Sequence, residues 1–213
     1  MKYFFNIIDQ IVFNKKLYLY IEILVDRIFR FYYKIRFKYY GNSIRWGNGF
    51  YKLIIPKTVR ISNPEKIVIQ DDCQFEDFVS LKVNNNEEYL IFGKGVRCNT
   101  YTYIHANSKI NIEDYVLIAP FCYIVSQNHW FKDNIPIMFQ SNIKSGNILI
   151  CIGSWIGTKA TILGNVTIVK DNVTIGKDSV IGANSLLLNL HTSGRSIIAG
   201  NPAKIIKRLN CER

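Results

Sequence analysis

Residues 156–168 read IGTKATILGNVTI, and the isoleucines of this stretch stand six residues apart. The same step recurs through residues 67–190, with slips between blocks. The positions that follow it are Ile69, Phe75, Leu81, Phe92, Cys98, Ile104, Ile112, Ile118, Ile124, Ile156, Ile162, Ile168, Ile175, Ile181 and Leu187. A period of six fits neither the 3.6 of a helix nor the alternation of an ordinary strand. It is the period of a β-helix, in which each hexad forms one short strand and a corner, so the pattern predicts an all-β solenoid.

Small or β-branched residues stand four positions after most of these apolar residues. They are Cys73, Val79, Val96, Thr102, Val116, Cys122, Ala160, Val166, Ser179 and Ser185. The five cysteines of the chain form no CxxC pair, and three of them fall on the repeat. We therefore expect them to be small core residues of a protein in a reducing compartment.

Residues 1–60 differ in composition from the rest of the chain. They hold 12 Lys and Arg against 3 acidic residues, a net charge of +9 of the +11 total. Apolar residues recur there at helical spacing, as at Leu17, Ile21, Leu24 and Ile28. The pattern predicts a helical, basic and aromatic extension, as one long helix or two shorter ones.

Two interpretations of this extension remain open. It either caps the open end of the solenoid, as terminal repeats require, or lies on an anionic membrane surface. Charges interrupt every window long enough for a membrane span, and no cleavage site marks a secretory signal. No binding motif accompanies the charge, so nucleic acid is not expected as a partner. We expect a cytoplasmic protein, located either in the cytosol or at the inner face of the cytoplasmic membrane.

The repeat is interrupted after Ile124 by about 25 residues, 125–150, that cannot be written as hexads. Loops that interrupt a solenoid leave its stacked core and often carry the binding face. This one contains His129, and imidazole exchanges protons near neutral pH. His129 is therefore the first candidate for chemistry. The sequence thus divides into the extension 1–60, a β-helix over 61–190 with this loop, and a tail over 191–213.

Residues 65–208 resemble the hexapeptide-repeat acyltransferases, and most closely their branch of maltose, galactoside and surface-polysaccharide acetyltransferases. The resemblance rests on four stretches: NHWF at 128–131, SWIGTKATILGNVTI at 154–168, VIGANS at 180–185 and IIAGNPAKIIKRL at 197–209. It implies a left-handed parallel β-helix, a homotrimer, and acetyl-CoA in a groove between neighbouring subunits.

The resemblance also implies catalytic roles. His129 would take the proton from the acceptor hydroxyl as general base, and the backbone N–H of Thr158 would stabilise the developing oxyanion. Trp155 lies just before Thr158 and would line the site for acyl group and acceptor, although packing on a coil corner is an equal alternative. Gly157 belongs to the same coenzyme-binding corner.

Acceptor binding is implied for Asn99 and Asn107. Asn99, in FGKGVRCNTYTYI, matches a position that faces the acceptor sugar. Asn107 stands where the galactoside and maltose enzymes have an aspartate, and an amide accepts hydrogen bonds less strongly than a carboxylate. The acceptor sugar is therefore expected to differ. The nearby His105 is expected to point outward into solvent.

The coenzyme end departs from the family pattern, because its usual Thr-Lys-Asp-Val-Pro-like turn is missing. The cations left to bind the coenzyme phosphates are Lys204, Lys207 and Arg208, with Arg195 near by. The segment VKDNVTI, residues 169–175, forms an extra unit of seven. It is expected to add a face and rotate all later residues by about a third of a coil.

Metal chemistry is not expected. Related solenoids with zinc need three converging histidines, whereas His105, His129 and His191 are widely spaced here. The branch resemblance, together with an extension compatible with a membrane surface, implies an acetyl-CoA-dependent O-acetyltransferase acting on a sugar hydroxyl, in surface-polysaccharide biosynthesis. The alternatives are N-acetylation of an amino sugar nucleotide, O-acetylation of a small sugar or xenobiotic, and a non-catalytic scaffold.

Overall fold

The computed structural model describes residues 54–56, 58–84, 89–164 and 173–210, together with Tyr20, Ile21, Leu24 and Ile28. The chain divides into two compact units, residues 1–40 and 41–213. The four described residues of the first unit are helical, and the remaining predictions for residues 1–53 lie outside the described residues. None of the helices in the described ranges has the length and apolar character needed to cross a membrane.

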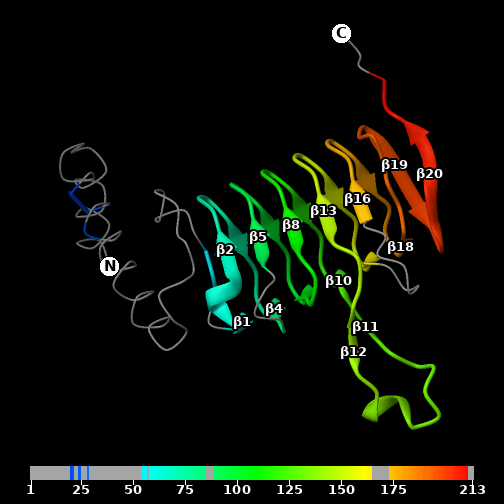
Figure 1. Cartoon of the computed structure of the whole chain (residues 1–213). Coiled ribbons are helices and arrows are strands. Elements are labelled where there is room, and N and C mark those ends of the chain that lie inside the picture. The colour runs from blue at the N-terminus through cyan, green and yellow to red at the C-terminus, as the bar shows by residue number, and fades with distance from the viewer. Residues whose placement is uncertain are drawn as a thin grey trace. The chain divides into compact units, whose positions relative to one another are not determined.

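The second unit is a parallel β-solenoid built from three sheets, as the six-residue period predicted (Figure 1). Sheet A contains β2 (Ile67–Ile69), β5 (Leu90–Phe92), β8 (Ile110–Ile112), β13 (Ile148–Ile150) and β16 (Val173–Ile175). Sheet B contains β3 (Gln74–Phe75), β6 (Arg97–Cys98), β9 (Leu117–Ile118), β14 (Trp155–Ile156), β17 (Val180–Ile181), β19 (Ser196–Gly200) and β20 (Ala203–Arg208). Sheet C contains β1 (Arg60–Ser62), β4 (Ser80–Val83), β7 (Tyr103–Ala106), β10 (Tyr123–Val125), β15 (Thr161–Leu163) and β18 (Leu186–Leu188).

The chain visits the sheets in the order C, A, B, so each coil has three corners, here called C–A, A–B and B–C. The described pairings between successive coils are parallel, and at the C-terminal end β19 and β20 pair antiparallel. A short 3-10 helix, η2 (Pro64–Lys66), occupies the first C–A corner.

The core consists of the predicted apolar positions, stacked one coil on the next. In sheet C, Ile104 lies between Leu81 and Ile124, and all three side chains are at most 1% exposed. The stack in sheet B runs through Phe75, Cys98, Ile118, Ile156 and Ile181. Every described member of the repeat is buried, because like positions of successive coils pair in register. The hexad prediction is confirmed.

The small residues four positions on lie inside the corners. Cys73, Val79, Thr102 and Ser185 are at most 1% exposed. Burial raises the pKa of Cys73 to about 12, so this thiol stays protonated and behaves as a small apolar group. The buried hydroxyls are paired; Thr102 Oγ1, for example, donates to the carbonyl of Ala119 at 3.2 Å.

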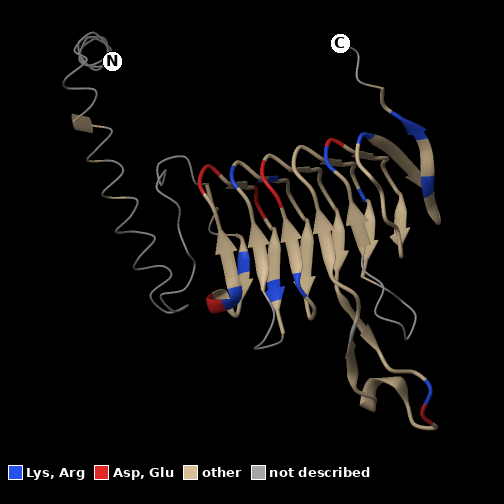
Figure 2. Cartoon of the chain, turned by 45° about the horizontal axis from the view of Figure 1, so that its top comes forward, with Lys and Arg blue, Asp and Glu red and all other residues tan. Residues whose placement is uncertain are grey.

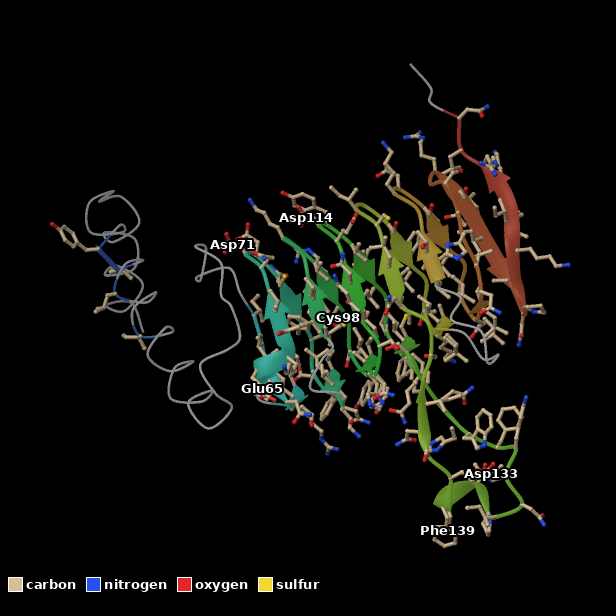
Figure 3. All side chains as sticks on the ribbon, viewed as in Figure 1. Glu65, Asp71, Cys98, Asp114, Asp133 and Phe139 are labelled. Atoms are coloured by element: carbon tan, nitrogen blue, oxygen red, sulfur yellow. The ribbon has the colours of Figure 1, made fainter. Side chains whose placement is uncertain are left out.

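The described acidic residues of the coils lie at the corners, whereas basic residues lie both at corners and on strands, as at Arg60, Lys82 and Arg97 (Figure 2). The A–B corner carries Asp71, Asp72, Lys94, Glu113, Asp114, Lys177 and Asp178. Asp71 and Asp114 lie along this edge, away from Glu65 at the first C–A corner (Figure 3). Charge at the corners and apolar stacks between them give each coil a solvated rim and a dry interior.

The expected rotation by the extra seven residues is wrong. Val173 of β16 pairs with Ile148 in sheet A, and Val180 of β17 then pairs with Trp155 in sheet B. The strands after the extra unit therefore keep their phase. In the sequence the added length lies between β15 and β16, and residues 165–172, Ile168 among them, lie outside the described residues.

Candidate functional site

An arm leaves the solenoid at the C–A corner between β10 and β13 (Figure 1). Its two strands, β11 (Gln127–His129) and β12 (Asn142–Lys144), pair antiparallel and set His129 opposite Asn142. The side chain of His129 is exposed. Its imidazole forms no hydrogen bond or ion pair with another residue in the described part of the chain.

The root of the arm is fixed to the coil by short polar side chains. Ser126 Oγ accepts the N–H groups of Asn107 and Ser108, both at 3.1 Å, and donates to the carbonyl of Ser108 at 2.6 Å. The hydroxyl of Ser108 in turn donates to the carbonyl of Ser145, where the chain returns from the arm. Sequence reasoning missed these positioning residues. The sequence feature that could have identified them is a serine at each end of the interruption, Ser126 and Ser145, with a third, Ser108, on the preceding coil.

The arm ends in a loop that satisfies its own polar groups. Gln140, only 7% exposed, donates from Nε2 to the carbonyls of Asp133 at 3.0 Å and Ile135 at 2.6 Å. Trp130 Nε1 donates to Asp133 Oδ1 at 2.8 Å. The apolar side chains of the tip are exposed instead: Phe131, Ile135, Ile137, Met138 and Phe139. Phe139 belongs to the short 3-10 helix η3 (Ile137–Phe139) and lies with Asp133 at the far end of the arm (Figure 3).

Asn99 and Thr158 both follow strands of sheet B, at the B–C corner. The side-chain amide of Asn99 donates to the carbonyl of Ile118 at 2.7 Å. Thr158 is exposed, and its hydroxyl donates to the carbonyl of Pro120 at 2.8 Å. Its backbone N–H donates to none of the described residues, whereas the N–H of Thr100, two coils earlier, reaches the Glu76 carboxylate at 3.3 Å. Within the described part of the chain, the Thr158 N–H is thus free for a ligand.

Trp155 and Gly157 flank this corner differently. Trp155 points outward from sheet B and is 49% exposed. Gly157 is buried, and a Cβ there would meet the carbonyl oxygen of Ile181 at 2.6 Å. Only glycine allows the two coils to approach this closely, so Gly157 sets the position of the neighbouring Thr158.

Asn107 lies at the C–A corner, beside the arm rather than beside Asn99. It is 9% exposed, and its side-chain amide donates to the carbonyl of Ile143 in β12 at 3.4 Å. The contact ties the amide to the arm.

His105 is not exposed, and the expectation that it points into solvent is wrong. It is 6% exposed, lies between Lys82 and Val125 in the sheet register, and has its Nδ1 3.3 Å from the Tyr103 hydroxyl. Its Nε2 is buried without a partner among the described residues. Burial, with a smaller effect of Lys82, lowers the pKa of His105 to about 4. His105 has neighbours on two other strands, β4 and β10, and the position of His105 within one hexad does not reveal them.

The C-terminal cations lie on the β19–β20 hairpin. Lys204 stands opposite Ala199 and Lys207 opposite Ile197, and both side chains are exposed. Arg208 Nη1 donates to Ser193 Oγ at 2.8 Å. Exposed ammonium and guanidinium groups of this kind suit a phosphate-bearing ligand.

One chain does not bring His129 and Thr158 together. The arm leaves from the C–A corner and Thr158 stands at the B–C corner, so the strands of sheet C separate them. Across the described ranges, no group of three or more His, Cys, Asp and Glu residues is arranged to hold a metal ion.

The sequence is similar to those of two acetyltransferases. It is 32% identical over 126 residues to the probable acetyltransferase Rv3034c of Mycobacterium tuberculosis, with 59% of this chain and 39% of that protein covered. It is 30% identical over 130 residues to the putative lipopolysaccharide biosynthesis O-acetyl transferase WbbJ of Escherichia coli, with 58% of this chain and 62% of that protein covered. The chain therefore spans less than two thirds of the length of either relative. No protein-family model matches it.

Two solved structures share the fold. A point mutant of AntD, an N-acyltransferase from Bacillus cereus in complex with dTDP and coenzyme A, matches with a TM-score of 0.65 and 20% identity, over 83% of this chain and 90% of that one. A galactoside acetyltransferase in complex with coenzyme A matches with a TM-score of 0.54 and 24% identity, over 68% and 66%. The predicted left-handed parallel β-helix is confirmed. The hexad-built coils, the arm that interrupts them and these likenesses together make the chain similar to the hexapeptide-repeat acyltransferases, whose fold it shares.

Proposed function

We propose that this protein is an acetyl-CoA-dependent O-acetyltransferase that acts on a sugar hydroxyl in a surface polysaccharide or its lipid-linked precursor. The observation that carries the proposal is that the chain presents both an exposed imidazole, His129, and a backbone N–H at Thr158 that has no partner among the described residues. The relative WbbJ, named for O-acetyl transfer in lipopolysaccharide biosynthesis, supports this acceptor class.

The residues present fit a coenzyme A thioester. Thr158 N–H lacks a partner among the described residues, and Lys204 and Lys207 present exposed ammonium groups for phosphate. Acetyl-CoA supplies an acetyl group activated as a thioester. Trp155, half exposed on the same corner, offers an apolar wall beside Thr158.

His129 acts as general base in this mechanism. Its imidazole takes the proton of the acceptor hydroxyl as the oxygen attacks the acyl carbon, and a positioned base of this kind typically contributes about 10²–10⁴-fold to the rate. The Thr158 N–H donates a hydrogen bond to the carbonyl oxygen as negative charge develops there. His129 then returns the proton to the departing thiolate.

The active site is formed between subunits of a homotrimer in this proposal. His129 and Thr158 lie on opposite edges of sheet C, so a site that uses both needs the arm of one subunit and the B–C corner of the next. The exposed apolar tip of the arm supports the same arrangement, because such side chains are stabilised by burial against a neighbour. Light scattering should report about three times the 24.7 kDa mass of the chain.

N-acylation of an amino sugar nucleotide is the second candidate. Its support is the fold likeness to AntD, an N-acyltransferase solved with dTDP-4-amino-4,6-dideoxyglucose and coenzyme A. The same base and thioester site serve an amine or a hydroxyl, so the acceptor decides between the two.

Substitution of His129 tests the proposal. The wild-type protein is assayed for acetyl-CoA consumption with a panel of surface-polysaccharide fragments and amino sugar nucleotides. His129→Ala should lower turnover at least about a hundredfold, with coenzyme binding by calorimetry nearly unchanged. His191→Ala, which removes an exposed histidine of the coil, is the matched control and should keep full activity. Activity of His129→Ala within a few-fold of wild type would reject the assignment, and no consumption with any acceptor would favour a scaffold.

A further inference from the structure

Three aromatic side chains stack along the B–C corner on successive coils. Phe78 and Tyr101 have ring centroids 4.9 Å apart and planes 11° from parallel, and Tyr101 and Phe121 are 5.2 Å and 4° apart. They are 51%, 51% and 50% exposed. We call these three residues the aromatic ladder. The distances correspond to offset stacking, which leaves part of each ring face and one edge toward solvent.

Folding of the coil does not require aromatic residues at these positions. Each ladder residue occupies the third position after a buried sheet B residue and has a left-handed backbone, with φ between 57° and 63°. The A–B corner has the same backbone requirement, and meets it at Asp72, Gly95, Tyr115, Gly153 and Asp178. Glycine and aspartate tolerate this conformation far better than bulky side chains do. The three consecutive aromatic residues therefore point to a purpose other than turn formation.

The ladder is continuous with the candidate active site. The next left-handed positions in its row are Lys159, directly after Thr158, and then Asn184. Asn99 precedes Tyr101 by two residues on the same corner. The ladder therefore extends from the acyl-transfer position toward the N-terminal coils.

Hydrogen-bonding groups accompany the rings. Asp77 and Glu76, exposed at the same corner, accept hydrogen bonds from the Thr58 hydroxyl at 2.6 Å and from the Thr100 N–H at 3.3 Å. Each carboxylate keeps further lone pairs for other donors. The surface thus combines half-exposed aromatic rings with two carboxylates on the coil that carries Phe78.

We infer that the aromatic ladder binds the non-reacting sugar units of an extended acceptor glycan. This inference rests on the proposed function and adds that the enzyme prefers a polymer or oligosaccharide over a free sugar. Pyranose rings present C–H faces that pack on aromatic rings and hydroxyls that donate to carboxylates. The cores of protein–protein interfaces are depleted of Asp and Glu, so the carboxylates beside the rings favour a glycan over a second copy of the chain. Binding of remote units would position the reacting hydroxyl at the catalytic end of the row.

Binding of the catalytically disabled His129→Ala protein to a printed array of bacterial glycans, from monosaccharides to long oligosaccharides, tests the inference. At least one extended glycan should bind, and Phe121→Ala or Tyr101→Ala should weaken that binding about tenfold per ring. Tyr115→Ala is the matched control, because Tyr115 has the same left-handed backbone and is 55% exposed on the other corner. It should leave glycan binding unchanged.

Three outcomes would overturn the inference: no extended glycan is retained, the ladder variants bind as tightly as the control, or Phe121→Ala dissociates the trimer. The last outcome would make the ladder a subunit contact. A second measurement separates this failure from that of the proposed function. In the otherwise wild-type enzyme, Phe121→Ala should raise the KM for an oligosaccharide acceptor but not for the corresponding monosaccharide. Equal KM values for both lengths with intact turnover would reject the ladder and leave the acetyltransferase standing.

Discussion

The coils and the arm of this protein place apolar residues in opposite ways. In the coils, Phe92 is fully buried and packs edge-to-face on Phe75 with ring centroids 5.1 Å apart. At the tip of the arm, Phe139 is 68% and Met138 78% exposed, while the polar Gln140 lies inside. The coils bury apolar area within one chain, so they carry the stability of the fold. The arm leaves its apolar area available, so its tip suits a contact made after folding.

Removal of a core aromatic ring should show the difference between coils and arm most strongly. Phe92→Ala should lower the free energy of unfolding by about 3–5 kcal/mol, because it removes buried area and leaves a cavity. Phe139→Ala, the matched change on the arm, should stay within about 0.5 kcal/mol. Urea denaturation followed by circular dichroism, in protein too dilute to assemble, provides the measurement. Equal losses for the two variants would show that the arm belongs to the folding core.

His105, at the junction of the two regions, should make stability depend on pH. Its pKa is about 4 in the folded chain against about 6.5 in an unfolded one. As pH falls below 6.5 the unfolded chain binds the proton first, so stability is full above pH 6.5 and is lost down to pH 4. Between pH 7 and pH 4.5, the free energy of unfolding of the wild-type protein should fall by about 2–3 kcal/mol more than that of His105→Leu, as measured by urea denaturation at each pH.

The groups facing His105 include Lys82 and Tyr103, and other carboxylates titrate over the same range. Those carboxylates are present in both the variant and the wild type, so their contribution to the pH dependence cancels when the two are compared. His191→Gln, at an exposed histidine, should follow the wild-type curve. Identical pH profiles for His105→Leu and wild type would show that this imidazole titrates normally.

The arm tip should matter for assembly more than for folding. Met138→Ser combined with Phe139→Ser should raise the trimer dissociation constant at least about tenfold, since burial of each side chain is worth about 1.5–3 kcal/mol. Sedimentation equilibrium over a dilution series provides the measurement. Ile206→Ser, at a 65% exposed apolar residue of β20, serves as the control. An unchanged constant in the double variant would remove the tip from the subunit contact.

Asn99 should give the smallest effect, confined to the acceptor. Asn99→Ala should raise the acceptor KM or lower kcat about tenfold while the acetyl-CoA KM stays within twofold. Steady-state assays with each substrate varied in turn separate the two. The side-chain amide of Asn99 also donates to the carbonyl of Ile118. If that structural contact were its sole role, Asn99→Ala would change the kinetic constants for both substrates equally.

The regular part of the fold could be predicted from the sequence because its cause is local. Within each hexad the apolar residue identifies the side chain that points into the core. Ile112, Ile118 and Ile124 accordingly occupy sheets A, B and C, as their spacing requires. The phase after Ile168 could not be predicted, because seven extra residues can form either a new face or an outward loop. The choice depends on the pairing of β16 with β13, which is a contact between coils.

The candidate site was less accessible to sequence reasoning, for the same reason. The interruption of the repeat singled out His129, the family resemblance alone singled out Thr158, and the roles of both remain predictions. The neighbours of His105 come from strands of other coils, β4 and β10. The aromatic ladder is visible in the sequence only after the corner positions are known, because Phe78, Tyr101 and Phe121 are separated by unequal intervals.

The C–A corner is where this chain can change in length. The arm departs and returns there, yet Ile124 still pairs with Ile162 on the following coil as it does with Ile104 on the preceding one. The sequence between β15 and β16 is also lengthened, and β16 still pairs with β13. Closing a longer loop adds only about 0.6 kcal/mol per doubling of length. Evolution, or an engineer, could therefore exchange whole segments at this edge between homologues and alter the choice of acceptor while the scaffold stays unchanged.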